Sequence, residues 1–445
     1  MVLHNERYRK PLTIHSPKMH AAFYVLLAAL MVLGVITSLF AVLAFVLFAA
    51  YVLLAESKKV FLSLFFLMPF AHIFKLSSGS TSLFTFIEII VLVKLVLQAK
   101  KINVKFLASW LILVVYLVVG FNMNVSVLIK QAMILPLIYF FFDENNKPDI
   151  KPLTLSYANG LLLSSLVGLF RDVIPNMDKF VIYDKAFDIE GEVYRFGALY
   201  SDPNYYSMSL ILVLVGILVL YARNRMGGVA FLYYAVVAFF GAITVSKSFV
   251  LMFAIVTIAN IYLLIRNKKM VGALLFSASV IVFAVLIFSG KIEMFNSTLD
   301  RFSSSQNLLE LTTGRSRILQ KYWTYLTEDV RRILLGAGVG ANMLGAAVAH
   351  NTYFDFLYYY GMLGTVLFAV SLSFAVKTNN RGKIGFFNVF PMICAIIMLF
   401  FLSGLLYYDF VFTLMYVFLY LGHNFDASSY GRKKLFLRNN YENQA

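Results

Sequence analysis

Apolar runs long enough to cross a lipid bilayer recur along almost the whole of this sequence. A transmembrane helix needs about 20 mostly apolar residues in succession. Of the 445 residues, 61% are hydrophobic and 13% are charged, whereas a soluble domain has about half and a quarter. Because backbone groups in lipid must be hydrogen-bonded within their own segment, the runs predict helices. We therefore expect an all-α, polytopic integral membrane protein.

Residues 1–445 are expected to form a single membrane domain with about 12–14 transmembrane helices. Two connections are far longer than the others, 171–204 and 290–350. Loops of more than about 12–15 residues are usually functional or disordered, so we expect function to reside in these two. The predicted helical segments are 20–36, 38–55, 59–75, 81–98, 104–120, 124–142, 153–171, 205–221, 228–245, 248–265, 270–289, 351–375, 385–402 and 405–422.

The basic residues predict the orientation of the chain in the membrane. The net charge is +16, which could suggest a nucleic-acid partner, but the positive-inside rule explains it better. With the N-terminus in the cytoplasm, the short outer turns contain only Lys75 and Lys247, and most other basic residues face inward. We expect both termini in the cytoplasm, both long loops outside, and residues 20–36 to be a retained helix rather than a signal peptide.

The sequence gives no indication of a metal or a thiol centre. Its single cysteine, Cys394, lies inside an apolar run, so neither a disulfide framework nor a thiol nucleophile is expected there. The His, Cys, Asp and Glu spacings that are typical of zinc sites are missing from the sequence. We expect no cofactor.

The first long loop ends in YRFGALYSDPNYYS and places a cation close to the membrane. Asp202 and Pro203 predict the cap and first turn of a helix, with Asn204 beside them. Arg195 is either a surface residue or a binding residue, since arginine suits bidentate recognition of phosphate. Lys247, in the short turn TVSKSFV, is either an interfacial lysine or part of the same anion site.

The second long loop contains TTGRSRILQKYWTYLTED, which has the apolar spacing of an amphipathic helix. Thr312 or Thr313 could cap this helix, which would put Arg315 in its first turn, where free N–H groups and an arginine can bind an anion. Arg317 could bind the same anion, or it could meet lipid phosphates together with Lys321. The apolar positions are Ile318, Leu319, Tyr322, Trp323 and Leu326, and the later Arg331 and Arg332 are expected to be surface residues.

A glycine-rich stretch, GAGVGANMLG at 336–345, follows this helix. It lacks the Lys-Ser/Thr ending of a nucleotide P-loop, and the predicted orientation puts it on the side of the membrane without nucleotide. It predicts either a flexible link or a close approach of two backbones.

His350 is the only histidine in a predicted outer loop, and it precedes a helix that carries Asn351 and Asp355 near its start. The N-terminus of a helix disfavours imidazolium, so the ring would stay neutral and could accept a proton. His350 is therefore either a general base or, together with Asn351, a cap of that helix.

In combination, these motifs resemble the bacterial O-antigen ligase/polymerase family. The resemblance rests on Arg195 with its Asp-Pro-Asn, then Ser-Lys, Gly-Arg-x-Arg, Gly-x-Gly-x-Gly, His-Asn and Gly-x-x-Gly, in that order. It covers roughly residues 190–365 by motif and the remainder only by helix pattern. It implies a C-type-like membrane glycosyltransferase that acts outside the membrane on a saccharide carried by undecaprenyl pyrophosphate, without metal or nucleotide.

The resemblance also implies roles for individual residues. Arg195 and Arg315 match pyrophosphate-binding arginines, and His350 matches the base that activates the acceptor hydroxyl. Lys247 stands where the family often has Ser-Arg, so its charge is kept but bidentate binding is put in doubt. The expected site comprises the base His350, the pyrophosphate-binding residues Arg195, Lys247, Arg315 and Arg317, and the supporting residues Asn204, Asn351 and Asp355.

Three functions remain open. We expect a polymerase in the bacterial inner membrane that joins undecaprenyl-pyrophosphate-linked repeats into O-antigen, capsule or exopolysaccharide. The alternative is an O-antigen ligase, which transfers the glycan to lipid A–core, and from another class a lipid-linked oligosaccharide flippase. The partners are the lipid-linked donor, a saccharide acceptor and the bilayer, with a chain-length regulator as a further candidate. A flippase should carry charges at membrane depth, and mid-span charges are few, chiefly Glu88 and Lys130.

Overall fold

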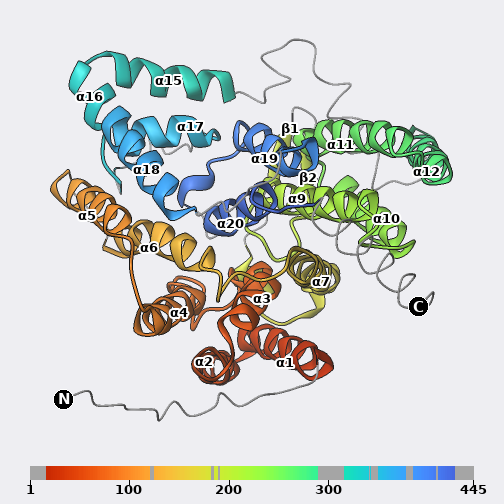
Figure 1. The fold of residues 1–445 in the computed structure, drawn as a ribbon. Coiled ribbons are helices and arrows are strands. Elements are labelled where there is room, and N and C mark those ends of the chain that lie inside the picture. The colour runs from red at the N-terminus through yellow and green to blue at the C-terminus, as the bar shows by residue number, and fades with distance from the viewer. Residues whose placement is uncertain are drawn as a thin grey trace, which may run out of the picture.

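The structure is a computed structural model that describes residues 17–120, 125–181, 185–188, 191–288, 315–339, 341, 349–376, 384–406 and 409–425. The predicted cap at Thr312 or Thr313 and half of the stretch 336–345 lie outside these residues. Helices dominate the described residues (Figure 1), as the apolar runs predict.

Every one of the fourteen predicted segments contains a helix. In the first half of the chain the helices are α1 (Pro17–Ile36), α2 (Ser38–Leu54), α3 (Ser57–Leu67), α4 (Leu83–Gln98), α5 (Val104–Val119), α6 (Val125–Phe141), α7 (Ile150–Leu169) and α8 (Met177–Phe180). In the second half they are α9 (Pro203–Ala222), α10 (Val229–Ala242), α11 (Lys247–Arg266), α12 (Met270–Phe288), α15 (Arg315–Thr327), α16 (Val330–Leu335), α17 (Thr352–Asp355), α18 (Gly361–Ala375), α19 (Phe386–Leu399) and α20 (Asp409–Leu421).

Five helical segments in the described part of the chain are long and apolar enough to cross a membrane. Seven further apolar helices are shorter, with 10–17 residues. A chain with this many apolar helices is an α-helical membrane protein. The five long segments are Lys18–Ile36, Ile150–Leu169, Pro203–Ala222, Lys247–Arg266 and Thr352–Ala375.

One feature of the first long loop was not expected. Two short strands, β1 (Lys185–Asp188) and β2 (Gly191–Tyr194), pair antiparallel with Lys185 opposite Tyr194. Short turns of 3₁₀-helix, Arg171–Val173 and Gly404–Leu406 (η2 and η5), occur in connecting segments. The hairpin ends at Tyr194, so Arg195 follows it directly, eight residues before α9 begins.

Two of the predicted segments differ from continuous helices. The segment 59–75 leaves the α-helix after Leu67 and makes a 3₁₀ turn, η1 (Met68–Phe70), because Pro69 cannot donate the next helical hydrogen bond. The segment 351–375 is interrupted by a π-helical turn, η4 (Phe356–Tyr360), and Gly361 then takes a φ of +62°. Such turns often occur at functional sites.

The π-helical turn lies against the first glycine of the glycine-rich stretch. Gly336 has a φ of +75°, and a Cβ placed on it would lie 2.6 Å from the Gly361 nitrogen. Ala337 N donates to Tyr358 O (2.6 Å), and Tyr116 Oη donates to Leu335 O (2.9 Å). At Gly336, therefore, the stretch makes the close approach of two backbones that was one of its two interpretations, and no larger residue fits at this contact.

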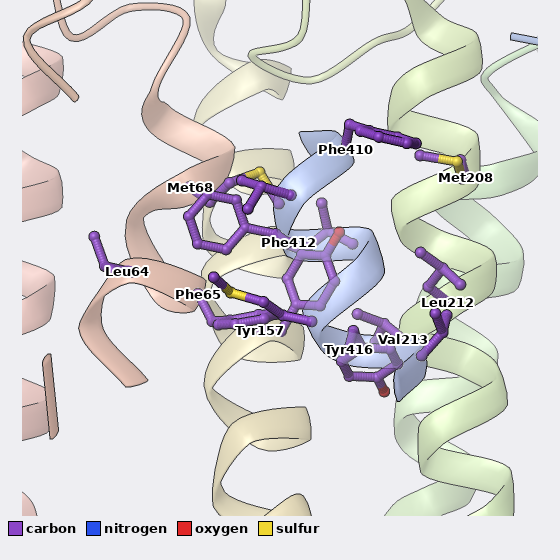
Figure 2. Close-up of a cluster of buried hydrophobic side chains, with 14 of the residues drawn as sticks. Leu64, Phe65, Met68, Tyr157, Met208, Leu212, Val213, Phe410, Phe412 and Tyr416 are labelled. Atoms are coloured by element: carbon purple, nitrogen blue, oxygen red, sulfur yellow. The ribbon is translucent and has the colours of Figure 1, made fainter. Parts of the chain in front are cut away.

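Helix α9 forms the centre of the fold and packs against α7, α10, α11 and α19 (Figure 1). Nearly all of its residues are buried, as expected for a helix that is apolar all round. Figure 2 shows a core cluster in which side chains from α3, α7, α9 and α20 meet. There the rings of Phe65 and Phe412 pack edge to face with centroids 5.1 Å apart. This core fixes the N-terminal end of α9 relative to α20.

Candidate active site

Arg195 is held at the start of α9 in a buried group of polar side chains, here called the arginine node (Arg195, Asn204, Thr244 and Ser246). Only 7% of Arg195 is exposed. Its Nη2 donates to Asn204 Oδ1 (2.9 Å), and its Nε donates to Thr244 O (3.4 Å). Ser246 Oγ donates to the same Asn204 oxygen (3.1 Å). Lys247 follows Ser246 and is half-buried, so the fold brings three predicted site residues, Arg195, Asn204 and Lys247, to one place.

The capped starts of α9 and α11 position the arginine node. Asp202 caps α9 by accepting from Asn204 N (2.7 Å), and Pro203 occupies the first turn, which confirms the interpretation of both residues. Asp202 Oδ1 also accepts from Asn204 Nδ2 (2.9 Å) and so fixes the direction of that amide. Ser246 caps α11 by accepting from Phe249 N (3.4 Å). The Asn204 oxygen is therefore aimed at Arg195 and Ser246.

His350 immediately precedes α17. It is half-buried and has a φ of +50°, in the left-handed region that non-glycine residues seldom occupy. Asn351, and not His350, is the cap of α17: its Oδ1 accepts from Tyr353 N (3.0 Å) and Phe354 N (3.2 Å). The alternative interpretation, helix capping, therefore applies to Asn351. Backbone conformations of this kind occur often at functional sites.

The start of α17 is bound to a short segment, 401–404, that connects α19 to η5 and is here called the 401–404 segment. Thr352 Oγ1 donates to Leu402 O (2.6 Å) and accepts from Gly404 N (2.8 Å). Ser403 Oγ donates to Asp355 Oδ1 (3.2 Å). The predicted supporting residue Asp355 is 1% exposed, so it lies within the protein and orients Ser403.

The 401–404 segment also contacts α15 and α9. The described part of α15 begins at Arg315, whose Nη1 donates to Phe401 O (3.1 Å). Tyr205 of α9, which adjoins Asn204 of the arginine node, donates its hydroxyl to Ser403 O. Four consecutive residues thus link Arg315, the start of α17, which follows His350, and the start of α9, where Asn204 binds Arg195. Sequence reasoning missed this segment because its backbone carbonyls, rather than distinctive side chains, make most of the contacts.

The amphipathic helix is confirmed as α15, with Tyr322 and Leu326 buried and Trp323 55% exposed. Arg317 is exposed and lies two residues after Arg315, so the two side chains leave the helix on different sides. Lys321 is exposed as well and lies one turn after Arg317. This placement favours the alternative, contact with lipid phosphates, for Arg317.

Sequence reasoning also missed the small polar residues that complete the arginine node. Thr244 Oγ1 donates to Gly241 O (2.6 Å) and accepts from Ser207 Oγ (3.2 Å) and Ser246 N (3.2 Å). Thr244 and Ser246 end an apolar run as TVS, and polar side chains in such runs usually face the protein interior. Their position in this run was the signal by which sequence reasoning could have identified them.

The arrangement combines fixed positive charge with a candidate proton acceptor. Arg195, Lys247 and Arg315 can stabilise a developing anion, and their effect is large where water is excluded. His350 can accept a proton from a hydroxyl if its ring is neutral. Comparisons with protein-family models, curated proteins and solved structures found no match.

Proposed function

We propose that this chain is a membrane glycosyltransferase that polymerises polyprenyl-pyrophosphate-linked oligosaccharide repeats into O-antigen, capsule or exopolysaccharide. In this proposal it resembles the O-antigen ligase/polymerase family and has a C-type-like fold with about 12–14 crossings. Both termini lie in the cytoplasm, and the loops 171–204 and 290–350 lie outside the bacterial inner membrane.

The observation that carries the proposal is the convergence on the 401–404 segment. Arg315 bonds to Phe401 O, Thr352 next to Asn351 bonds to Leu402 O, and Tyr205 next to Asn204 bonds to Ser403 O. Residues from three parts of the sequence, each containing one predicted motif, therefore share one backbone segment. A site for a lipid-linked pyrophosphate needs cations and a base held together in this way.

The chemistry proposed for this site is a displacement at the anomeric carbon. His350 takes the proton of the acceptor hydroxyl, whose oxygen forms the new bond to the anomeric carbon. The bond from that carbon to the pyrophosphate oxygen breaks, and the electron pair leaves with undecaprenyl pyrophosphate. Arg195, Lys247 and Arg315 stabilise the charge that develops on this leaving group. Attack from the opposite face inverts the anomeric centre.

Deletion of the gene tests the proposal against the ligase. Loss of a polymerase leaves single repeats on their final acceptor. Loss of a ligase leaves a bare acceptor and accumulated lipid-linked polymer, and that result would contradict the polymerase. Accumulation of lipid-linked single repeats on the cytoplasmic face would instead indicate the flippase.

Reporter fusions test the orientation on which the proposal depends. Fusions after residues 18, 225 and 380 should report the cytoplasm, and fusions near 185 and 320 the outside. A cytoplasmic signal at 320 would place Arg315 on the wrong side of the membrane for a polyprenyl-linked donor.

A further inference from the structure

One large aromatic side chain of α15 is exposed and is not used by the proposed chemistry. Trp323 is 55% exposed, whereas Tyr322 and Leu326 on the same helix are buried. The other exposed residues of α15 are all polar: Arg317, Gln320, Lys321, Thr324 and Thr327. An indole in such a surface leaves a large, rigid apolar face in contact with water, and faces of this kind are favoured contacts in molecular recognition.

Ring contacts fix the direction of Trp323. The rings of Tyr322 and Tyr325 pack against that of Tyr358, with centroids 4.9 Å and 5.4 Å away. The Trp323 ring itself packs edge to face with Phe354 of α17, with centroids 6.3 Å apart, where α15 lies alongside α17 (Figure 1). Both geometries are of the kind that aromatic pairs prefer. Because α15 is held at these three rings, the exposed side of the indole keeps a fixed place.

The contact with Phe354 puts Trp323 beside the residues of the proposed chemistry. Phe354 is in the first turn of α17, where its N–H donates to Oδ1 of the cap Asn351 (3.2 Å), and His350 directly precedes that cap. Arg315 lies eight residues before Trp323 on α15, which is about 12 Å along a helix axis. This separation suits a sugar beyond the one that is bonded to the pyrophosphate.

Two uncharged polar residues share the exposed side of α15 with Trp323. Gln320 lies three residues before it and Thr327 four residues after it, and such positions are neighbours on a helix surface. Thr327 Oγ1 donates to Trp323 O (2.9 Å), so the hydroxyl oxygen can still accept a hydrogen bond. Gln320, Trp323 and Thr327, with Phe354 behind them, are here called the tryptophan patch.

The composition of the tryptophan patch indicates what kind of ligand it fits. The face of an aromatic ring carries partial negative charge, and it attracts the C–H groups of a pyranose, which the neighbouring oxygens polarise. The Gln320 amide both donates and accepts hydrogen bonds, and the Thr327 oxygen accepts them, as sugar hydroxyl groups require. A ring face bordered by such groups matches a sugar, which has an apolar face and a polar rim.

Contact with lipid is the other role that an exposed tryptophan can have in a membrane protein. Lipid contact would place apolar side chains around the ring, but the exposed neighbours of Trp323 on its own helix are polar. Three of the four exposed residues of α16, by contrast, are apolar: Val330, Leu334 and Leu335. The surroundings of Trp323 therefore favour a ligand that carries hydrogen-bonding groups over a lipid chain.

We infer that the tryptophan patch is a saccharide subsite, which stacks one sugar of the lipid-linked donor against the Trp323 ring. The identity of the ligand rests on the proposed function. Trp323 binds the apolar face of the sugar, and Gln320 and Thr327 bind its hydroxyl groups. Phe354 supports the indole from α17 and so joins the subsite to the helix start that follows His350.

The test is a calorimetric binding titration with the purified full-length protein in lipid nanodiscs. The probe is the water-soluble oligosaccharide that mild acid releases from the lipid-linked fraction of the producing cells. Trp323→Ala should raise its Kd about tenfold, since the stacking surface is lost, and Trp323→Tyr should keep most of the affinity because it retains a ring. The matched control is Phe86→Ala, which removes an exposed ring from an apolar stripe of α4 that also exposes Val93 and Leu97 and should leave the Kd unchanged.

Tryptophan fluorescence distinguishes the subsite from a lipid contact. The chain has two tryptophans, so Trp110→Phe leaves Trp323 as the only one. The oligosaccharide should change its emission in a saturable way, whereas brominated lipids in the nanodisc should quench it little. Strong quenching by brominated lipids, or absence of oligosaccharide binding to the wild-type protein, overturns the subsite.

Unfolding midpoints identify variants that fail to fold. If Trp323→Ala is among them, Gln320→Ala at its exposed position provides the binding test and should also raise the Kd of the oligosaccharide. A Kd that is unaltered in every folded variant of the patch overturns the subsite.

A second ligand separates the subsite from the cations and from the proposed function. Binding of undecaprenyl pyrophosphate without sugar should be unchanged in Trp323→Ala and weakened in Arg315→Ala. Polymer synthesis by a protein whose Trp323→Ala variant binds the oligosaccharide normally would refute the subsite and leave the polymerase standing. Binding that depends on Trp323, in a protein that makes no polymer, would refute the polymerase and retain the saccharide site.

Discussion

The arginine node and the α4–α20 polar residues (Thr85 and Glu88 of α4, and Asp409 and Thr413 of α20) are all buried, but their hydrogen bonds differ. In the node, the Asn204 oxygen accepts from Arg195 and Ser246, and its amide nitrogen donates to Asp202. Among the α4–α20 polar residues, five oxygens have no partner in the described part of the chain. The hydrogen bonds of the node are therefore satisfied on folding, whereas these five oxygens of α4 and α20 are not.

The two regions therefore contribute differently to the free energy of unfolding. A buried polar atom without a partner costs roughly 1–3 kcal/mol of stability, and a typical protein has a total of only about 5–15 kcal/mol. A satisfied network such as the node avoids this cost and gains rigidity. Rigid cations suit a reaction that develops charge at one point.

The largest expected effect is a loss of turnover on substitution of His350, which lies two residues before Thr352 and its contacts with the 401–404 segment. His350→Ala should lower the turnover of purified protein with lipid-linked donor by about 10²–10⁴-fold, because a positioned base is removed. His350→Asn is the matched control, since Asn tolerates the left-handed backbone but is a poor base. Near-normal turnover by His350→Asn would show that the histidine is structural.

A smaller effect is expected at the cations. Arg315→Ala and Arg195→Ala should each lower donor use by about 10–100-fold, the range for a lost hydrogen bond to a charged group. Arg332→Ala is the control: Arg332 pairs with Glu328 (2.6 Å) and lies over the Tyr325 ring, away from the 401–404 segment. Equal product ladders from all three variants would refute the role in binding pyrophosphate.

The same change, threonine to valine, is made once in each region, and thermal unfolding compares the resulting changes in stability. Thr244→Val should destabilise the protein by about 1–3 kcal/mol, because it leaves the partners of the Thr244 hydroxyl unsatisfied. Thr413→Val should stabilise it by up to about 1 kcal/mol, because it replaces an unpartnered buried hydroxyl with a methyl group. A loss of stability in Thr413→Val equal to that in Thr244→Val would mean that the two regions do not differ.

The smallest expected effect is on substitution of Asn351, and it distinguishes the role of this residue from that of its neighbour His350. Asn351→Ala should cost about 1 kcal/mol of stability through loss of the α17 cap, and Asn351→Asp or Asn351→Ser should restore it. Turnover per folded molecule should change little in comparison with His350→Ala. A loss of turnover in Asn351→Ser as large as that in His350→Ala would indicate that the cap itself positions the reacting groups.

Local patterns in the sequence were enough to predict the helices and their starts. The apolar runs predict the fourteen helical segments, and Asp202 and Pro203 predict where α9 begins. These features depend on hydrophobic burial, proline geometry and helix capping, which act over a few residues. The π-helical turn before Gly361 was missed because it depends on a contact with Gly336, 25 positions earlier in the sequence.

Only the tertiary structure determined which polar groups have partners. Residues 401–404 meet Arg315, Thr352 and Tyr205 through backbone carbonyls, which every residue type possesses. In the same way, nothing local to Thr244 or Thr413 distinguishes a hydroxyl with three partners from one with none. Composition and spacing thus determined that this chain forms membrane helices. The packing of helices distant in sequence determined which of its buried charges are satisfied and which oxygens still lack a donor, since hydrogen bonds between helices form only when those helices meet.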